Sequence, residues 1–136
     1  MLETLRLAGA QAQDLRLSAE EILENGPAPS VLLVEDEPQI ASAICSGLPD
    51  CQITSVGDGI EALEKIHDRI FDVVLLDLRL PRMDGLAVLR TLKASPEVAH
   101  IPVVVLTAHG AIEEKVHAFE LGAHDFITKP FVISEL

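Results

Sequence analysis

Short apolar runs alternate with amphipathic stretches along most of the chain. Five of the runs are continuous, and most of them are rich in β-branched residues; they lie at 31–34, 53–56, 73–76, 103–106 and 126–127. Runs without alternating polar residues are typical of strands that are covered on both faces of a parallel sheet. Four stretches with helical spacing of apolar residues separate the runs, at 37–48, 58–69, 84–94 and 111–121. This alternation predicts right-handed βαβ units and a doubly wound α/β fold with a five-stranded parallel sheet.

Residues 1–29 follow a different pattern. Apolar residues recur there at steps of three and four, which predicts one face of a helix: Leu2, Leu5, Ala8, Ala12 and Leu15. Ser18 and Glu21 have the spacing of a capping box, so a second short helix is expected after the first. One glycine and two prolines at 25–29 then predict a stiff connector. We therefore expect an N-terminal helical extension with a linker over 1–29 and the main domain over 30–136.

The C-terminal end predicts an incomplete element. Ser134 has the place of an N-cap for a fifth helix, but the turns of that helix do not follow it in this sequence. A truncated or missing fifth helix would leave one edge of the sheet uncovered. Our hypothesis is that residues 1–29 cover this edge, within one chain or across a dimer. The alternative is that they connect to an upstream domain, or that the chain is truncated.

Composition narrows the range of functions. Acidic residues outnumber basic ones 22 to 10, and the net charge of −12 would repel a phosphate backbone. With no Trp or Tyr for base stacking, we expect no direct contact with nucleic acid. No apolar run approaches the roughly 20 residues that span a bilayer, so we expect no membrane contact and a cytoplasmic protein. Cys45 and Cys51 lack the spacing of a zinc site and are expected to be ordinary reduced thiols.

Polar residues follow four of the predicted strands, at the ends where parallel sheets bind ligands. Glu35 and Asp36 follow the first strand, Asp77 the third, Thr107 the fourth and Lys129 the fifth. Each has an ordinary explanation alone, such as a helix N-terminus, a strand-end cap or a solvated cation. Together, three carboxylates at one rim would repel one another unless a cation lay between them.

Oxygen ligands without soft donors favour a hard divalent ion, above all Mg²⁺. Because Mg²⁺ takes one or two carboxylates and a phosphate oxygen, such a site suits phosphoryl transfer. Asp77 would then be a carboxylate nucleophile toward phosphorus. Lys129 and Thr107 would neutralise and hydrogen-bond the phosphoryl oxygens that gain charge in the transition state.

Four blocks of the sequence, in order, resemble the receiver domain of two-component response regulators. They are VLLVEDE at 31–37, VVLLDLRLPRMDG at 73–85, VVVLTA at 103–108 and GAHDFITKPF at 122–131. The resemblance covers about 30–136 and implies a flavodoxin-like sheet with strand order 2-1-3-4-5. It also implies a phosphoprotein of a phosphorelay, which changes its partner-binding face when it is phosphorylated.

The resemblance assigns roles to residues of the predicted site. Asp77 matches the phosphoacceptor, which takes its phosphoryl group from a histidine kinase or a His-phosphotransfer protein. Glu35 and Asp36 match the acidic pair that holds Mg²⁺, or Mn²⁺ as a substitute, together with Asp77 and the backbone carbonyl of Arg79. The downstream partner of such a domain is a protein, and a homodimer through the N-terminal helix or the fourth helix and fifth strand is an open alternative.

The resemblance also implies a conformational switch. Thr107 matches the hydroxyl that moves toward the phosphoryl group, and Phe126 matches the aromatic residue that turns inward behind it. Lys129 matches the lysine that contacts the phosphoryl group, and its bond to Pro130 resembles the cis peptide of the family. We further hypothesise that Arg79 and His109, each two residues beyond a site residue, tune hydrolysis of the acyl phosphate.

Two other functions stay open from the sequence alone. A phosphatase of the haloacid-dehalogenase type also uses an aspartyl nucleophile with Mg²⁺, but it usually has a second Asp two residues later, where this chain has Arg79. We therefore expect a phosphoacceptor that assists its own phosphorylation and dephosphorylation, and not a turnover enzyme. A receiver-shaped scaffold that binds partners without phosphorylation is the second alternative.

Overall fold

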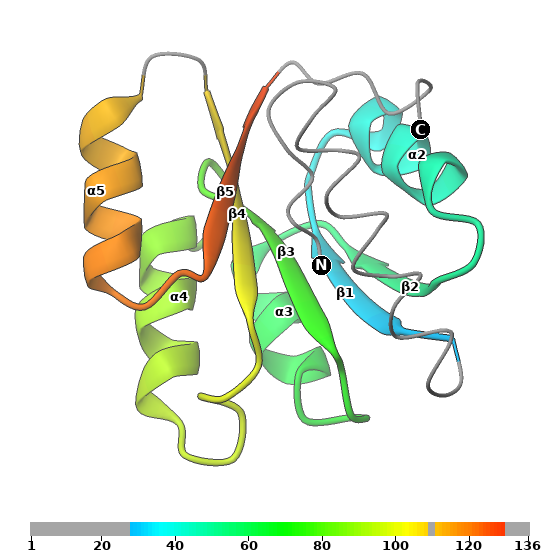
Figure 1. Ribbon diagram of the computed structural model, residues 1–136, viewed down its shortest axis with the longest axis horizontal. Coiled ribbons are helices and arrows are strands. Elements are labelled where there is room, and N and C mark those ends of the chain that lie inside the picture. The colour runs from blue at the N-terminus through cyan, green and yellow to red at the C-terminus, as the bar shows by residue number, and fades with distance from the viewer. Residues whose placement is uncertain (1–27, 109–110, 130–136) are drawn as a thin grey trace.

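The computed structural model describes residues 28–108 and 111–129, which form an alternating α/β structure (Figure 1). The strands are β1 (Ser30–Val34), β2 (Gln52–Val56), β3 (Val73–Asp77), β4 (Val103–Ala108) and β5 (Asp125–Lys129). The helices are α2 (Pro38–Gly47), α3 (Gly59–Lys65), α4 (Gly85–Ala94) and α5 (Ile112–Glu120). The predicted N-terminal helices and the start of a fifth helix at Ser134 lie outside the described residues, as does Pro130.

All five strands belong to one parallel sheet with the order β2-β1-β3-β4-β5. The doubly wound fold and the flavodoxin-like strand order are both confirmed. Parallel neighbours need a crossover, and in this sheet each crossover contains a helix. The carboxyl ends of β1, β3, β4 and β5 therefore reach the same rim of the sheet.

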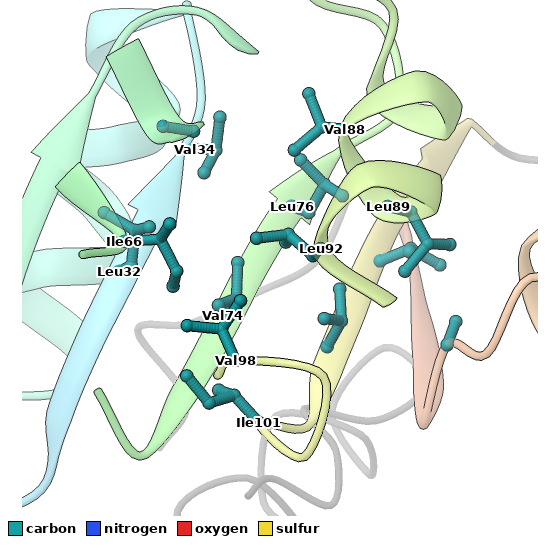
Figure 2. Packing of buried hydrophobic residues seen from close by; sticks show 14 of the residues in the cluster. Leu32, Val34, Ile66, Val74, Leu76, Val88, Leu89, Leu92, Val98 and Ile101 are labelled. Carbon is teal, nitrogen blue, oxygen red and sulfur yellow. The ribbon is translucent and has the colours of Figure 1, made fainter. Parts of the chain in front are cut away.

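Alternate residues of the central strands enter two separate apolar clusters, because successive side chains of a strand point to opposite faces. The first, which we call the three-helix cluster, lies beneath α3, α4 and α5 (Figure 2); it includes Leu32, Val34, Ala62, Val74, Leu76, Val88, Leu89, Leu92, Val103, Val105 and Ala118. The second, which we call the α2 cluster, lies on the other face; it consists of Val31, Leu33, Ile44, Leu48, Val73, Leu75, Val104, Leu106 and Ile127. Burial on both faces explains why these strands read as continuous apolar runs.

The helices follow the predicted ranges with one clear difference. The helix predicted over 58–69 ends at Lys65. Beyond it the Asp68 amide donates to the Lys65 carbonyl, which is a turn and not a helical hydrogen bond. His67, Asp68 and Arg69 are exposed, so no buried apolar contact extends the helix through them.

Two further sequence expectations concern the cysteines and the membrane. Cys45 and Cys51 are free thiols that pack, half-buried, against the α2 cluster, as predicted. Burial raises the pKa of the Cys51 thiol to about 11, so it is protonated at neutral pH. Within the described ranges, the helices all fall short of the length and apolar content that crossing a bilayer requires.

Candidate functional site

The alternation of the strands carries three charged side chains to one side of the rim. Every second residue of β1 and β3 belongs to the α2 cluster, and the next positions in these two series are Glu35 and Asp77. In β5, Ile127 belongs to the same cluster and Lys129 lies two residues further on. The three side chains therefore share the α2 face of the sheet, where the pattern of their strands places them.

Thr107 and Phe126 lie in the opposite series. Thr107 follows Val103 and Val105, which belong to the three-helix cluster, and Phe126 packs half-buried against that cluster. The site is therefore divided by the sheet: the charged groups lie on the α2 side, while the predicted switch residues lie on the side of α4 and α5.

Lys129 joins the two buried acids. Its Nζ lies 2.9 Å from Oδ2 of Asp77 and 3.0 Å from Oε1 of Glu35. Glu35 and Asp77 are only 3% and 4% exposed, so both carboxylates depend on partners inside the protein. Two backbone amides supply further bonds, from Glu37 to Glu35 Oε2 at 3.1 Å and from Arg79 to Asp77 Oδ1 at 2.9 Å.

Burial and crowding shift the ionisation of this group. Burial raises the pKa of the Glu35 carboxyl to about 7, and the charge of Asp77 acts in the same direction against the bond from Lys129. Burial alone would lower the pKa of Lys129, but its bonds to Asp77 and Glu35 outweigh this effect and the pKa is raised. One cation therefore faces more negative charge than it neutralises.

The acidic residues fit a divalent metal ion. One carboxylate oxygen from each of Glu35, Asp36 and Asp77 lies within 4.8 Å of the others. Glu35 and Asp77 are buried, Asp36 is exposed, and all three offer the hard oxygen donors that Mg²⁺, Mn²⁺ and Ca²⁺ prefer. The predicted convergence of these residues is therefore confirmed. Arg79 reaches the cluster through its amide, and the role of its carbonyl as a metal ligand stays a prediction.

The predicted switch residues make a long hydrogen bond, at Thr107, and ring contacts, at Phe126. Thr107 is buried, and its hydroxyl donates to the Ile127 carbonyl over 3.5 Å, which is a long bond. The ring of Phe126 lies edge-on to Phe119 with centroids 5.7 Å apart, and Lys115 Nζ is 4.6 Å from its centroid. Their movement on phosphorylation stays a prediction, and His109 lies outside the described residues.

Two ion pairs near the rim were not predicted from the sequence. Arg82 holds Asp58 through Nε at 3.0 Å and Nη2 at 2.6 Å, and its own backbone has a positive φ of 63°. Arg79 Nη2 lies 3.7 Å from Oε1 of Glu114 in the first turn of α5. These contacts join residues far apart in the chain, and no local pattern indicates them.

Replacing Lys129 with methionine is expected to destabilise the domain without metal. The change removes the cation between two buried acids and keeps the apolar stem. We expect a loss of about 1–2 kcal/mol, below the ~3–5 kcal/mol of a fully buried pair because Glu35 can protonate instead. Adding Mg²⁺ should then raise the melting temperature of Lys129→Met more than that of the unchanged chain, measured by differential scanning calorimetry.

Lys65→Met is the matched control. Lys65 pairs with Asp68 at 3.5 Å, with both side chains about half exposed. Because exposed pairs contribute little, this variant should unfold within about 0.5 kcal/mol of the unchanged chain and respond to Mg²⁺ in the same way. An equal Mg²⁺ response in both variants would contradict a charge-balancing role for Lys129.

The comparisons with known proteins agree with this geometry. The family model of the response regulator receiver domain matches residues 31–136. The chain is 38% identical over 107 residues to the transcriptional regulatory protein CiaR of Streptococcus pneumoniae, covering 78% of this chain and 47% of CiaR. It is 34% identical to the DNA-binding dual master transcriptional regulator RpaA of Synechocystis, covering 79% of this chain and 46% of RpaA. The chain thus spans about half the length of these curated relatives.

Solved structures share the fold over most of the chain. A response regulator of Chloroflexus aurantiacus superposes with a TM-score of 0.76 at 30% identity, covering 81% of this chain and 91% of that one. The phosphorylated cyanobacterial phytochrome response regulator RcpA gives 0.72 at 32% identity, covering 79% and 85%. The Mn²⁺-bound form of response regulator Rcp1 gives 0.70 at 28% identity, covering 79% and 86%.

These relatives correct one prediction made from the sequence. The expectation of no direct contact with nucleic acid is wrong for this class of protein, because its members include transcriptional regulators and RpaA is DNA-binding. The charge argument took the −12 of this chain as the charge of the whole protein. The relatives contain a further half that this chain does not match, so the net charge of this chain does not describe that half.

The relatives also bear on the metal site and on the two alternative functions. Receiver domains bind a divalent metal, Rcp1 has been solved with Mn²⁺, and the acidic cluster of this chain suits such an ion. Nothing in the fold, the site or the relatives favours a haloacid-dehalogenase-like phosphatase or an unphosphorylated scaffold. From its sequence blocks, its strand order and its relatives, the chain belongs to the receiver domain family of two-component response regulators.

Proposed function

We propose that this chain is a phosphoacceptor switch in which Asp77 receives a phosphoryl group from the phosphohistidine of a histidine kinase or His-phosphotransfer protein. The observation that carries the proposal is the position of Asp77, buried in an acidic cluster with Lys129 Nζ 2.9 Å from its Oδ2. The phosphorylated state of the relative RcpA supports it. We place this reaction in the cytoplasm, as the sequence predicted.

The transfer needs only one bond to form and one to break. An oxygen of Asp77 attacks phosphorus, the bond from phosphorus to the donor breaks, and the donor leaves with the electron pair and takes up a proton if it is a histidine nitrogen. Water later attacks the acyl phosphate, which restores the carboxylate and releases inorganic phosphate. Glu35, Asp36, Asp77 and the backbone carbonyl of Arg79 would hold Mg²⁺, which would supply positive charge to the phosphoryl oxygens.

The other side chains act on the phosphoryl group once it is attached. Lys129 already donates to Asp77 and is placed to donate to a phosphoryl oxygen. Thr107 gives up only a 3.5 Å bond to Ile127 if its hydroxyl turns toward the new oxygens. Phe126 is half-buried on the same side of the sheet as Thr107, so movement of one opens space for the other. The signal is then a changed surface at α5 and β5.

We propose that the domain does not turn over an external substrate. A phosphatase needs a general acid to protonate the leaving group, and the residue two positions after Asp77 is Arg79, whose side chain is a permanent cation. Hydrolysis of the acyl phosphate on the domain itself returns the switch to its resting state and consumes one phosphoryl group per cycle.

The test is incubation with acetyl phosphate and Mg²⁺, followed by intact mass spectrometry and by measurement of released phosphate. We expect one phosphoryl group per chain, and none when EDTA removes the metal. Phosphate should be released at the slow rate at which the adduct decays. Many rapid turnovers per chain would support the phosphatase instead, and the absence of any adduct would support the scaffold.

A further inference from the structure

Arg79 connects the phosphoacceptor to helix α5. Its backbone amide donates to Oδ1 of Asp77 at 2.9 Å, so its Cα is fixed beside the acceptor. Its side chain leaves the cluster, and Nη2 lies 3.7 Å from Oε1 of Glu114. One residue therefore touches both the site of chemistry and the first turn of α5.

The contact with Glu114 is loose. At 3.7 Å it is an ion pair without a hydrogen bond, and within the described part of the chain Glu114 Oε1 is buried and has no hydrogen-bond partner. The Arg79 side chain is 69% exposed, so packing does not fix its direction. A stronger anion near Asp77 would therefore meet little resistance in drawing the guanidinium away.

Within the described residues, the start of α5 lacks a side-chain cap. Its N-cap is Ala111, which provides no side-chain cap hydrogen bond. Glu114 stands in the first turn, where the helix dipole favours an acid and where Arg79 supplies the neighbouring cation. Ile112, at the first position of the helix, is 68% exposed, so burial of that side chain does not hold the turn.

We propose that Arg79 is a charge-exchange contact, which leaves Glu114 for the phosphoryl group on Asp77 and so releases the first turn of α5. The inference rests on the function proposed above. A phosphoryl group adds about −1.5 to −2 charges and three acceptor oxygens, whereas Glu114 offers one charge at a long distance. Guanidinium also binds phosphoryl oxygens in pairs, which a 3.7 Å contact cannot match.

The movement of Arg79 from Glu114 to the phosphoryl group would act alongside the Thr107–Phe126 switch. Thr107 and Phe126 lie on the face of the sheet that α5 covers, whereas Arg79 reaches α5 from the loop after β3. Helix α5 exposes apolar side chains at helical spacing, at 68%, 52% and 43% of their surface: Ile112, Val116 and Phe119. A change in the order of its first turn would therefore alter how an apolar stripe is presented.

Hydrogen exchange at the start of α5 tests the proposal; it is measured at the Lys115 amide, whose hydrogen bond to the Ala111 carbonyl at 3.1 Å closes the first turn. The full chain is measured with Mg²⁺, before and after reaction with acetyl phosphate, and intact mass is recorded for each sample. In the unchanged chain we expect phosphorylation to speed exchange about two- to fivefold, the range that a partly exposed ion pair supports. Glu114→Gln and Arg79→Gln should exchange faster from the start, by the same factor, and change little on phosphorylation.

Glu113→Gln is the matched control. It removes the same charge from the same turn, but Glu113 is exposed and does not pair with Arg79. It should respond to phosphorylation as the unchanged chain does. A response like that of Glu114→Gln would mean that loss of any negative charge from this turn has the same effect, and it would overturn the charge-exchange contact.

The mass measurement separates the two proposals. If the unchanged chain gains no phosphoryl group, the proposed function fails, and the proposed charge-exchange contact of Arg79 fails with it. If the adduct forms while α5 exchange stays constant, or if Glu114→Gln and Arg79→Gln keep the full response, only the charge-exchange contact is overturned.

Discussion

Asp77→Asn is expected to abolish uptake of the phosphoryl group. The amide keeps the size of the side chain and can still accept the hydrogen bond from the Arg79 amide. It lacks the anionic oxygen that attacks phosphorus, so labelling by acetyl phosphate and Mg²⁺ should fall to the background seen with EDTA. Intact mass spectrometry, with peptide mapping of any residual adduct, measures the change.

The variant should remain folded. Lys129 keeps its contact with Glu35 at 3.0 Å, and repulsion between two carboxylates is removed. We expect its free energy of unfolding to stay within about 1 kcal/mol of the unchanged chain, which a denaturant titration can show. Loss of labelling in a folded variant is then a chemical effect and not a consequence of unfolding.

Asp84→Asn is the control for Asp77→Asn. Asp84 caps α4 by accepting from the Leu86 amide at 3.2 Å, and asparagine caps equally well. The side chain is exposed and belongs to the loop between β3 and α4, near the site in sequence. This variant should take up one phosphoryl group as usual. Equal labelling of Asp77→Asn and Asp84→Asn would exclude Asp77 as the acceptor.

The sequence predicted those site residues whose positions depend on the pattern of a single strand. Strands buried on both faces must be apolar throughout, so a polar residue at the end of such a run marks the rim of the sheet. Glu35 and Asp77 are both found in this way, and Lys129 is found from the shared direction of parallel strands. The pattern of the chain thus brings acids and cation together, and the register decides which atoms meet.

Long-range contacts between flexible side chains are not indicated by any comparable pattern in the sequence. The pairing of Arg79 with Glu114 depends on where α5 begins relative to the loop after β3. The positive φ of Arg82 is likewise set by the path of that loop, and its guanidinium then reaches Asp58 across the rim. Neither follows from spacing along the chain, because both depend on the position of two separate segments.

Gly85→Ala is expected to have the largest effect on folding. A Cβ at Gly85 would lie 2.5 Å from the Asp77 carbonyl oxygen and would also overlap the Leu78 backbone. The Gly85 amide donates to the Leu78 carbonyl at 3.1 Å, so the first turn of α4 cannot simply move away. Because the obstacle is backbone and not a flexible side chain, we expect a loss of about 3 kcal/mol or more, the upper end of overpacking. Urea titration followed by circular dichroism measures it.

The same variant links the packing of α4 to the chemistry of Asp77. Relief of the overlap must shift either α4 or the backbone of Asp77 and Leu78, so the folded fraction should also accept a phosphoryl group more slowly. Gly57→Ala is the control, because among the described residues, its two chain neighbours aside, no atom lies within 4 Å of a Cβ at Gly57, and its φ is not positive. That variant should match the unchanged chain in stability and in labelling rate. A Gly85→Ala domain as stable as Gly57→Ala would show that the close approach of α4 to the end of β3 is not required for the fold.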